Sequence, residues 1–572
     1  MPASQASQHH QATAATTSAR LLSALLPTDL TFLTFLTLPL ISLHHKSAPP
    51  SNKMDLQTES YIANLPQELV DRIVDFLPTA DLGSLRRTCK LMEHKLFTYF
   101  SKHYFTKKQF MVTEASLHAL VDISEHPSLS PCLKHLIIGL DRYNGRTRDM
   151  ADEAAFTEYK EASESQSRMF TTGRAASLLA RALSNLKSLQ TIDLRDFNSM
   201  TRYRDRQTGT GAWRSWGAPT LQARGHVLTM NDSAMYDGRG KFFYTRVFQV
   251  VLAAMAGSSS RPEALMVTLR NRIRGLSDSA FGLDDWMQRD IAPALAGLKT
   301  LHLDLSPDDP PRYGLVQSQS NSQDTFDPQN TSIRRFLSHT PNVTWLRLNF
   351  QSAHRDSSLR LINWLATVPG TDPTARILPW AGLDTAAGRL SPLPWSDTNP
   401  APVALPLTQL DLGMVYISTN VVTDLFQKFS NLKGLSLFNT KLYPASRIHP
   451  GRRVNLWADL LKDLSANIPA NLWSLKLRNL TQINTEKIQN PDLLVEFDGR
   501  PERTIEVSKK SLEQLAETVT PRWPPELPHM HHDDGEDEDE DGDEDEDGDG
   551  DGDGDGDEDG MEQNSEDVQI LL

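Results

Sequence analysis

A leucine pattern that recurs along most of the chain constrains its fold more than any other feature. In each occurrence, an apolar periodicity of helical type ends and a short alternating segment of the form L-x-x-L-x-L follows. This change of period predicts a helix followed by a strand. The apolar positions are Leu189, Ile192 and Leu194; Leu298, Leu301 and Leu303; Val343, Leu346 and Leu348; Leu407, Leu410 and Leu412; Leu432, Leu435 and Leu437; and Leu472, Leu475 and Leu477, with Leu133, Leu136 and Ile138 as the expected first set.

Repeated helix–strand units predict a stacked fold, because neighbouring units in register bury the apolar face of each helix and each strand. We therefore expect an α/β domain over residues 106–520, and its pattern resembles an irregular leucine-rich-repeat solenoid. The starts at residues 407, 432 and 472 are unevenly spaced, whereas such repeats usually take about 20–29 residues. An ordinary α/β domain with helix–strand crossovers is the alternative. Segments without apolar periodicity predict long loops near residues 200–240, 306–332 and 370–402.

Ahead of this region, residues 64–97 carry two apolar stripes at helical spacing, split by a Pro-Thr-Ala-Asp turn at residues 78–81. Pro66 and Glu68 suit a first helical turn, and Asp81 is a plausible cap for a second helix. The first stripe contains Leu69, Ile73 and Leu77 with Val70 and Val74 beside them, and the second runs through Leu82, Leu85, Cys89, Met92 and Leu96. The sequence predicts a hairpin of two helices with a continuous second seam.

A hairpin of about 40 residues cannot cover both stripes by itself, because chains that small usually need a metal, disulfides or a partner. Cys89 and Cys132 are the only cysteines, which excludes a disulfide framework and a cysteine-only zinc site and favours a reducing compartment. We therefore expect a partner protein to cover the hairpin. The alternative is that residues 65–96 form the first helical pair of a larger fold.

The hairpin sequence resembles an F-box, the adaptor-binding module of cullin-RING ubiquitin ligases, and we assign this module to residues 61–105. Thr88 stands where the family usually has Val, and Met92 where it often has Trp. An F-box followed by a leucine-rich region also resembles a large group of fungal F-box proteins. The positions that match the family pattern, and that the resemblance implies as adaptor-binding, are Leu65, Pro66, Glu68, Leu69, Ile73, Leu77, Leu82, Leu85 and Cys89, with Asp81 beside Leu82.

This resemblance implies a non-catalytic substrate receptor. Its partners would be the Skp adaptor, a cullin-RING core reached through that adaptor, and a protein substrate held on the leucine-rich region. The implied mechanism is proximity, which raises the effective concentration of a substrate lysine near the ubiquitin-charged enzyme. A non-ligase interaction scaffold is the second hypothesis, and an enzyme within residues 106–520 is a third. We expect cytoplasmic or nuclear localisation.

The two ends of the chain have unusual compositions. Residues 1–53 combine a low-complexity stretch with an apolar one that Pro27, Asp29 and Pro39 interrupt. We expect an unstructured extension there, with a targeting or membrane segment as the alternative. Residues 521–572 form an expected disordered acidic tail. From residue 533 onward the tail holds 23 Asp or Glu and no Lys or Arg, so residues 1–532 carry +8 of the total charge of −15.

Few motifs point to chemistry. Residues 551–562 fit the spacing of a calcium loop, but such a match is nearly unavoidable in a tract of Asp and Gly, and we expect a solvated polyanion instead. The histidines at 529 and 531–532 are more often solvated than metal-bound in a Pro-rich linker. The sequence contains no P-loop, HExxH, nucleophile elbow or CxxC motif. We therefore expect no catalytic residues, cofactor or metal, and no nucleic-acid partner.

Overall fold

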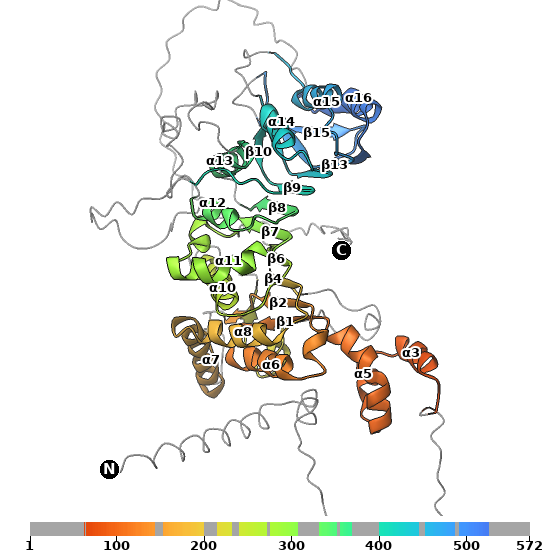
Figure 1. Cartoon of the computed structure of the whole chain (residues 1–572), viewed down its shortest axis with the longest axis vertical. Coiled ribbons are helices and arrows are strands. Elements are labelled where there is room, and N and C mark those ends of the chain that lie inside the picture. The colour runs from red at the N-terminus through yellow and green to blue at the C-terminus, as the bar shows by residue number, and fades with distance from the viewer. Residues whose placement is uncertain are drawn as a thin grey trace, which may run out of the picture. The chain divides into compact units, whose positions relative to one another are not determined.

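The computed structural model describes residues 62, 64–143, 153–198, 214–230, 239–270, 275–306, 331–351, 355–368, 400–444, 452–486 and 491–524 (Figure 1). The expected extension at 1–53 and the acidic tail from 525 onward lie outside these residues, and so do 307–330 and 369–399 of the expected loops. Contacts between residues divide the chain into Met1–Trp523 and Pro524–Leu572, and the described fold belongs almost entirely to the first unit.

A ten-stranded sheet runs through the described part of the chain, and its strand order follows the order of the strands in the sequence. All neighbours are parallel except the last pair, in which β16 runs antiparallel to β13. The strands, in order, are β1 (Lys107–Met111), β2 (His135–Gly139), β4 (Thr191–Arg195), β6 (Ala264–Thr268), β7 (Thr300–Leu305), β8 (Trp345–Phe350), β9 (Gln409–Gly413), β11 (Gly434–Phe438), β13 (Ser474–Arg478) and β16 (Glu502–Glu506).

Helices return the chain from one parallel strand to the next, and α6, α8, α10 and α11 pack consecutively against one another beside the strands (Figure 1). The helices are α6 (Glu114–Glu125), α7 (Glu153–Thr171), α8 (Arg174–Asn185), α9 (Ala218–Ala223), α10 (Arg239–Ala256), α11 (Asp285–Ala296), α12 (Thr331–Ser338), α13 (Arg355–Ala366), α14 (Thr419–Lys428), α15 (Leu456–Ala466) and α16 (Lys509–Thr518), with short 3₁₀ turns at Ser130–Cys132 and Asp278–Phe281.

The leucine pattern places one buried residue of each strand from β2 to β13 of this sheet in a row across it. Each of these residues pairs in register with the next, and all are fully buried because they face the helices. The row is Leu136, Ile192, Leu265, Leu301, Leu346, Leu410, Leu435 and Leu475. The helix-then-strand prediction is thus confirmed at every predicted set, and β6 is an additional strand of the same kind.

A smaller five-stranded sheet lies at the carboxyl end of the described region. Met414, Asn439 and Asn479 follow β9, β11 and β13 and adopt left-handed backbone conformations, with φ of 53°, 48° and 51°. Each of these residues turns the chain into a second short strand at the same place in its unit. The strands of this sheet are β10 (Tyr416–Ser418), β12 (Lys441–Tyr443), β14 (Leu480–Gln482), β15 (Leu493–Phe497) and β17 (Val519–Pro521), and β3 (Arg142–Tyr143) pairs separately with β5 (Leu228–Thr229).

Among the described residues, three helices precede the sheet, where the sequence predicts two. They are α3 (Gln67–Asp75), α4 (Thr79–Arg86) and α5 (Lys90–Tyr104). The prediction of one continuous second helix is wrong, because Cys89 is extended (φ −159°, ψ 162°) and begins α5 as its N-cap. Asp81 is likewise not a cap, since it lies inside the first turn of α4 and Pro78 occupies the N-cap position.

Part of the loop expected near residues 200–240 is packed structure. Ser215 is fully buried, and its backbone neighbour Trp216 forms a parallel bridge to Phe110 at the edge of β1. The ends of the other expected loops are also structured, because Ser306 is buried after β7 and Thr331 begins α12. Among the described helices, none combines the length and the apolarity that a membrane crossing requires.

Candidate functional site

Helix α3 and the two residues that follow it carry two apolar stripes side by side, each with the i, i+4, i+7 spacing of one helical face. Val70, Val74 and Leu77 form the first, which we call the inner stripe. Leu69, Ile73 and Phe76 form the second, which we call the outer stripe. The two stripes differ by one residue in register, so they face directions about 100° apart around the helix axis.

The inner stripe is covered by the chain itself. Val70 and Val74 are fully buried and belong to the same hydrophobic core as Met92 and Leu96 of α5 and Leu82 of α4. Burying a side chain of this size contributes roughly 1.5–3 kcal/mol. The inner stripe therefore explains why α3 packs against α4 and α5 without a metal or a disulfide.

Polar contacts from α5 hold both ends of α3. At the amino end, Lys95 Nζ donates to the carbonyl of Leu65 (2.7 Å), and Gln67 Nε2 donates to the carbonyl of Lys95 (2.8 Å). At the carboxyl end, the Tyr99 hydroxyl donates to Asp75 Oδ1 (2.6 Å). These contacts fix the rotation of α3 on α5, so the outer stripe is presented in one orientation.

Helix α4 is attached through Arg86, whose side chain is buried. Its guanidinium lies 3.6 Å from the centre of the Phe100 ring, and Nη2 is 3.8 Å from Glu93 Oε1. Burial lowers the pKa of Arg86 to about 10, with Glu93 opposing the shift, so the group stays charged at neutral pH. Arg86 therefore joins α4 to α5 by a cation–π contact and a partly buried ion pair.

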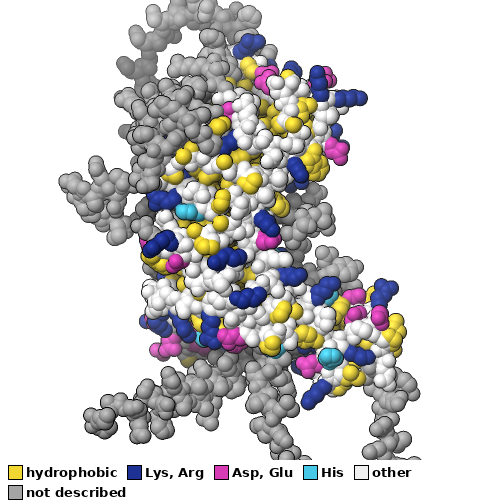
Figure 2. Space-filling model, viewed as in Figure 1, with side chains coloured by type: hydrophobic (Ala, Val, Ile, Leu, Met, Phe, Trp, Pro, Cys, Tyr) yellow, Lys and Arg dark blue, Asp and Glu magenta, His cyan; other side chains and the backbone are white. Residues whose placement is uncertain are grey.

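The outer stripe remains uncovered. Leu69 is 50% exposed, Ile73 45% and Phe76 85%. Ile62 before α3 and Leu91 in the first turn of α5 are also about half exposed, and hydrophobic side chains are visible over α3 in Figure 2. A cluster of large exposed apolar side chains on one small element marks an interaction surface rather than chance exposure.

The residues predicted to bind a partner divide into three groups. Pro66, Glu68, Leu69, Ile73 and Cys89 are exposed. Leu65, Leu77 and Leu85 are half-buried and pack against the core. Leu82 is only 1% exposed, so it stabilises the packing of the three helices and offers almost no surface.

Sequence reasoning missed Phe76, Ile62 and Leu91. Phe76 had a usable signal, since it lies three residues after Ile73 and seven after Leu69. The pattern was assigned instead to Leu77, which has an equally good helical spacing but belongs to the inner stripe. The positions that depart from the family pattern are accommodated locally. Met92 is buried in the core, and the Thr88 hydroxyl donates to the carbonyl of Leu85 (2.7 Å).

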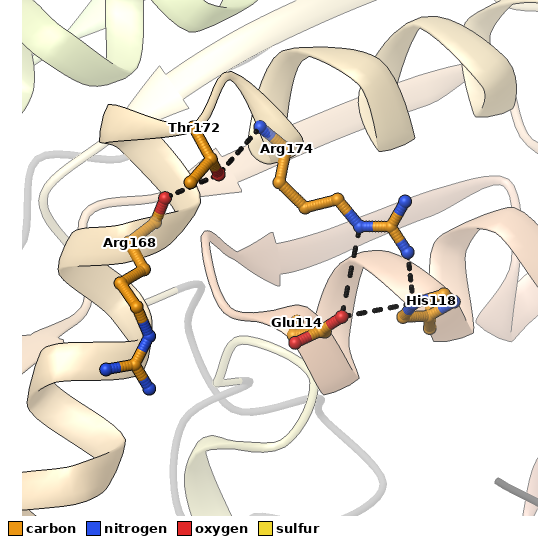
Figure 3. Close-up of polar contacts among 5 residues, drawn as sticks. All are labelled: Glu114, His118, Arg168, Thr172 and Arg174. Carbon is orange, nitrogen blue, oxygen red and sulfur yellow. Dashed lines mark hydrogen bonds and ion pairs between the residues drawn. The ribbon is translucent and has the colours of Figure 1, made fainter. Parts of the chain in front are cut away.

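A separate polar cluster on α6, α7 and α8 has residue types that also occur in catalytic sites (Figure 3). The Arg174 side chain lies between Glu114 (Nε–Oε1 3.9 Å) and His118 (Nη2–Nε2 3.3 Å). The Thr172 hydroxyl donates to the carbonyl of Arg168 (2.7 Å) and accepts from the backbone N–H of Arg174 (3.4 Å). The Thr172 hydroxyl is thus engaged in hydrogen bonds at the junction of α7 and α8. The cluster links helices on the protein surface.

Ser215 and Asp141 form a buried pair beside β1 and β2. The Ser215 hydroxyl donates to Asp141 Oδ2 and accepts from Gln109 Nε2 (3.0 Å). Burial raises the pKa of Asp141 to about 6, although the Ser215 contact opposes the shift. Both groups are enclosed by protein, so this contact anchors the segment at 214–217 to the sheet. The described residues also contain no group of three or more His, Cys, Asp or Glu side chains placed to bind a metal.

Comparison with known families identifies the three-helix element. A family model of the F-box domain matches residues 62–95, which run from just before α3 into the first turns of α5. No curated protein matches the chain. The chain therefore carries an F-box, a domain that generally binds the Skp adaptor within ubiquitin ligase complexes, and F-box proteins are typically non-catalytic.

Proposed function

We propose that the chain is the substrate-recognition subunit of a Skp-cullin-F-box ubiquitin ligase. The observation that carries this proposal is the uncovered outer stripe of Leu69, Ile73 and Phe76 within the F-box. The chain's own later segments leave this apolar surface exposed, and an adaptor that covers the stripe would remove it from water. Removal of apolar surface from water is the main favourable contribution to most protein association.

Residues 106–520 would be the substrate-binding part, as an irregular leucine-rich-repeat-like solenoid. Parallel strands in chain order, buried leucines in register and helices between successive strands support this reading. So do the left-handed residues Met414, Asn439 and Asn479, which recur at one place in three consecutive units. The chain would act without catalytic groups of its own, by holding a substrate lysine near the ubiquitin-charged enzyme.

The proposed location is the cytoplasm or the nucleus. Cys89 and Cys132 are both free thiols, which fits a reducing compartment. An interaction scaffold outside the ubiquitin system is the alternative function, since the same outer stripe would also dock on a partner other than the Skp adaptor.

Copurification separates the two functions. Tagged full-length chain, expressed with the Skp adaptor and a cullin, is expected to retain both proteins. Replacement of Leu65 and Pro66 by Ala is expected to remove them, because Pro66 precedes the first turn of α3 and Leu65 packs against the core. Retention of the adaptor and the cullin by that variant would contradict the ligase proposal, as would failure of the unmodified chain to bind the adaptor.

A further inference from the structure

The ten-stranded sheet has two edges, and the described chain differs in how it treats them. At the first edge, the backbone N–H of Trp216 donates to the carbonyl of Gln109 (2.9 Å), and Trp216 forms a parallel bridge to Phe110 of β1. At the last edge, β16 pairs with β13 and, within the described residues, with no further strand. Every residue of β16 except the half-buried Ile505 is exposed. Such an edge strand can pair with a segment of another chain.

Two hydrogen bonds fix which backbone groups of β16 point away from the sheet. The N–H of Asn479 donates to the carbonyl of Pro501 (2.8 Å), and the N–H of Val507 donates to the carbonyl of Trp473 (2.8 Å). In an antiparallel pair, residues that bond to the partner strand alternate with residues that do not. The odd-numbered residues of β16 therefore bond to β13, and the even-numbered ones direct their N–H and C=O groups outward. These outward residues are Glu502, Thr504 and Glu506.

Most of the outward backbone groups have no hydrogen-bond partner within the described part of the chain. They are the N–H groups of all three outward residues and the carbonyls of Glu502 and Thr504. The remaining group, the carbonyl of Glu506, accepts from the Ser511 hydroxyl (2.8 Å). Pro501 has no N–H at one end of this edge, and α16 follows the other end. The edge therefore accommodates an extended segment of about five residues, roughly 17 Å long.

The charges on β16 disfavour a second copy of the chain as the occupant. Antiparallel pairing of two copies that uses all of β16 places Thr504 opposite Thr504. Glu502 of each copy then lies opposite Glu506 of the other copy. Like charges directly opposite each other destabilise a pair of strands. A partner with a different sequence avoids this repulsion.

The side chains of β16 indicate what the occupant carries on each face of the sheet. We call the face with the row of buried leucines the leucine face and the opposite one the polar face. On the polar face, Glu502 is paired with Arg478 (Nε–Oε2 3.1 Å), and Glu506 lies diagonally opposite Lys476. Carboxylates and cations are balanced there. Uncharged polar side chains of the occupant therefore suit the polar face.

The leucine face of β16 has different requirements. Arg503 pairs in register with Leu477 and Ile505 with Leu475, so both lie on this face. Ile505 packs against the hydrophobic core and leaves part of its surface exposed. Arg503 is exposed and makes no ion pair or side-chain hydrogen bond with another described residue. An apolar residue opposite Ile505 and an acidic residue opposite Arg503 complement these two side chains.

We propose that the outer side of β16, which we call the open edge, binds an extended segment of a substrate protein as an added strand. The inference rests on the proposed function, since it names the substrate class of the same receptor. The segment runs antiparallel to β16, because antiparallel pairing is slightly more stable per residue. Its pattern is Thr-Val-Thr-Asp-Thr, with Val opposite Ile505 and Asp opposite Arg503. Main-chain hydrogen bonds give affinity, and alternate side chains give specificity.

The test uses full-length chain and fluorescein-labelled peptides of about nine residues with Thr-Val-Thr-Asp-Thr at the centre, long enough to span the open edge. One derivative is N-methylated at the central Thr, whose N–H faces Thr504. The matched derivative is N-methylated at Val, whose N–H points away from β16. A third derivative has Lys in place of Asp. Fluorescence anisotropy measures binding.

The chain variant is Arg503→Glu, and its matched control is Lys462→Glu, which makes the same change of charge at an exposed position on α15. Copurification of the Skp adaptor is measured for each protein. Sedimentation velocity, with and without the parent peptide, measures self-association of the unmodified chain.

The parent peptide is expected to bind the unmodified chain and the control alike. Methylation of the central Thr should weaken binding by roughly 10-fold or more, and methylation of Val by less than about threefold. Arg503→Glu should bind the parent peptide roughly 3- to 10-fold more weakly and should prefer the Lys derivative.

Four results would overturn the proposal: no binding of the parent peptide, equal losses from the two methylations, an unchanged preference in Arg503→Glu, or self-association that the parent peptide disrupts. The last result would make a second copy the occupant. The adaptor should copurify with every variant. Its failure to bind the unmodified chain contradicts the proposed function, whereas absent peptide binding with the adaptor retained contradicts only the open edge.

Discussion

Truncation of the outer stripe tests the assignment of α3 as the adaptor-binding helix. The change is Ile73→Ala with Phe76→Ala. Phe76 is 85% exposed and Ile73 is 45% exposed, so truncation of these side chains costs the free protein less than truncation of a buried one. By contrast, a partner that covers these side chains gains the free energy of burying the apolar surface that the fold leaves exposed.

The magnitude follows from these fractions. Full burial of such a side chain contributes roughly 1.5–3 kcal/mol, and a partner can gain only the share that is still exposed. For the two residues together this gives an upper limit of about 2–4 kcal/mol. At about 1.4 kcal/mol for each factor of ten, the dissociation constant for the adaptor is expected to rise by up to roughly 30- to 700-fold.

Calorimetric titration with purified Skp adaptor measures this change, and circular dichroism checks that the variant remains folded. The matched control is Trp286→Ala, which removes a large half-exposed side chain from α11, outside the F-box. The control is expected to bind like the unmodified chain. A folded double variant whose affinity falls less than threefold, or a control that loses as much, refutes the assignment of the outer stripe.

Three further predictions concern stability. Val74→Ala removes a fully buried side chain of the inner stripe and is expected to lower the free energy of unfolding by roughly 1–3 kcal/mol, measured by urea denaturation. Asn439→Ala should cost about 1–2 kcal/mol because φ is 48°, whereas Asn439→Gly should cost almost nothing; equal effects would contradict the backbone argument. Burial raises the pKa of Asp304 to about 6, and its contribution to stability is fully present below pH 4, where the carboxyl is protonated in both states. The free energy of unfolding is expected to fall by about 3 kcal/mol through this group as pH rises through 6. Asp304→Asn should flatten the pH dependence of the urea midpoint between pH 4 and 7.

The strands were predictable from the sequence because their signal is local. In each set, as in Leu435 and Leu437, two apolar residues alternate with polar ones, and both ends of the pattern lie within six residues. No long-range information is needed to find such a strand. The order of the strands then follows because units that are consecutive in the chain pack side by side in space.

The break between α4 and α5 was not predictable from periodicity. Leu85, Cys89 and Met92 keep helical spacing across the break, and no Gly or Pro marks it. Helix α4 ends where the Thr88 hydroxyl donates a hydrogen bond to the carbonyl of Leu85 and the backbone of Cys89 is extended. A side-chain contact of this kind competes with a backbone hydrogen bond, and its outcome depends on the packing of α4 against α5.

The surface of the protein also combines features that a local sequence pattern predicts with features that only the folded structure shows. The outer stripe lies on one helix, so its i, i+4, i+7 spacing is visible in the sequence, and only the choice between Phe76 and Leu77 required the structure. By contrast, one row of side chains across the large sheet joins Arg347 of β8 to Lys476 of β13, which are far apart in the chain. Their shared row depends on the register of four strands, and a shift of one residue in any strand would turn its side chains to the other face.

The connection between α5 and β1 bears on how proximity would operate. Only Phe105 and Thr106 separate the two elements, and the carbonyl of Thr106 accepts from the backbone N–H groups of Lys134 and His135 (3.0 and 2.9 Å). Lys108 Nζ lies 5.0 Å from the centre of the Phe105 ring, and α5 contacts β1 directly. A long flexible tether dilutes a bound substrate over a large volume. In the proposed receptor, a joint of two residues fixed by hydrogen bonds would instead set the local concentration of substrate lysines through the geometry of the fold.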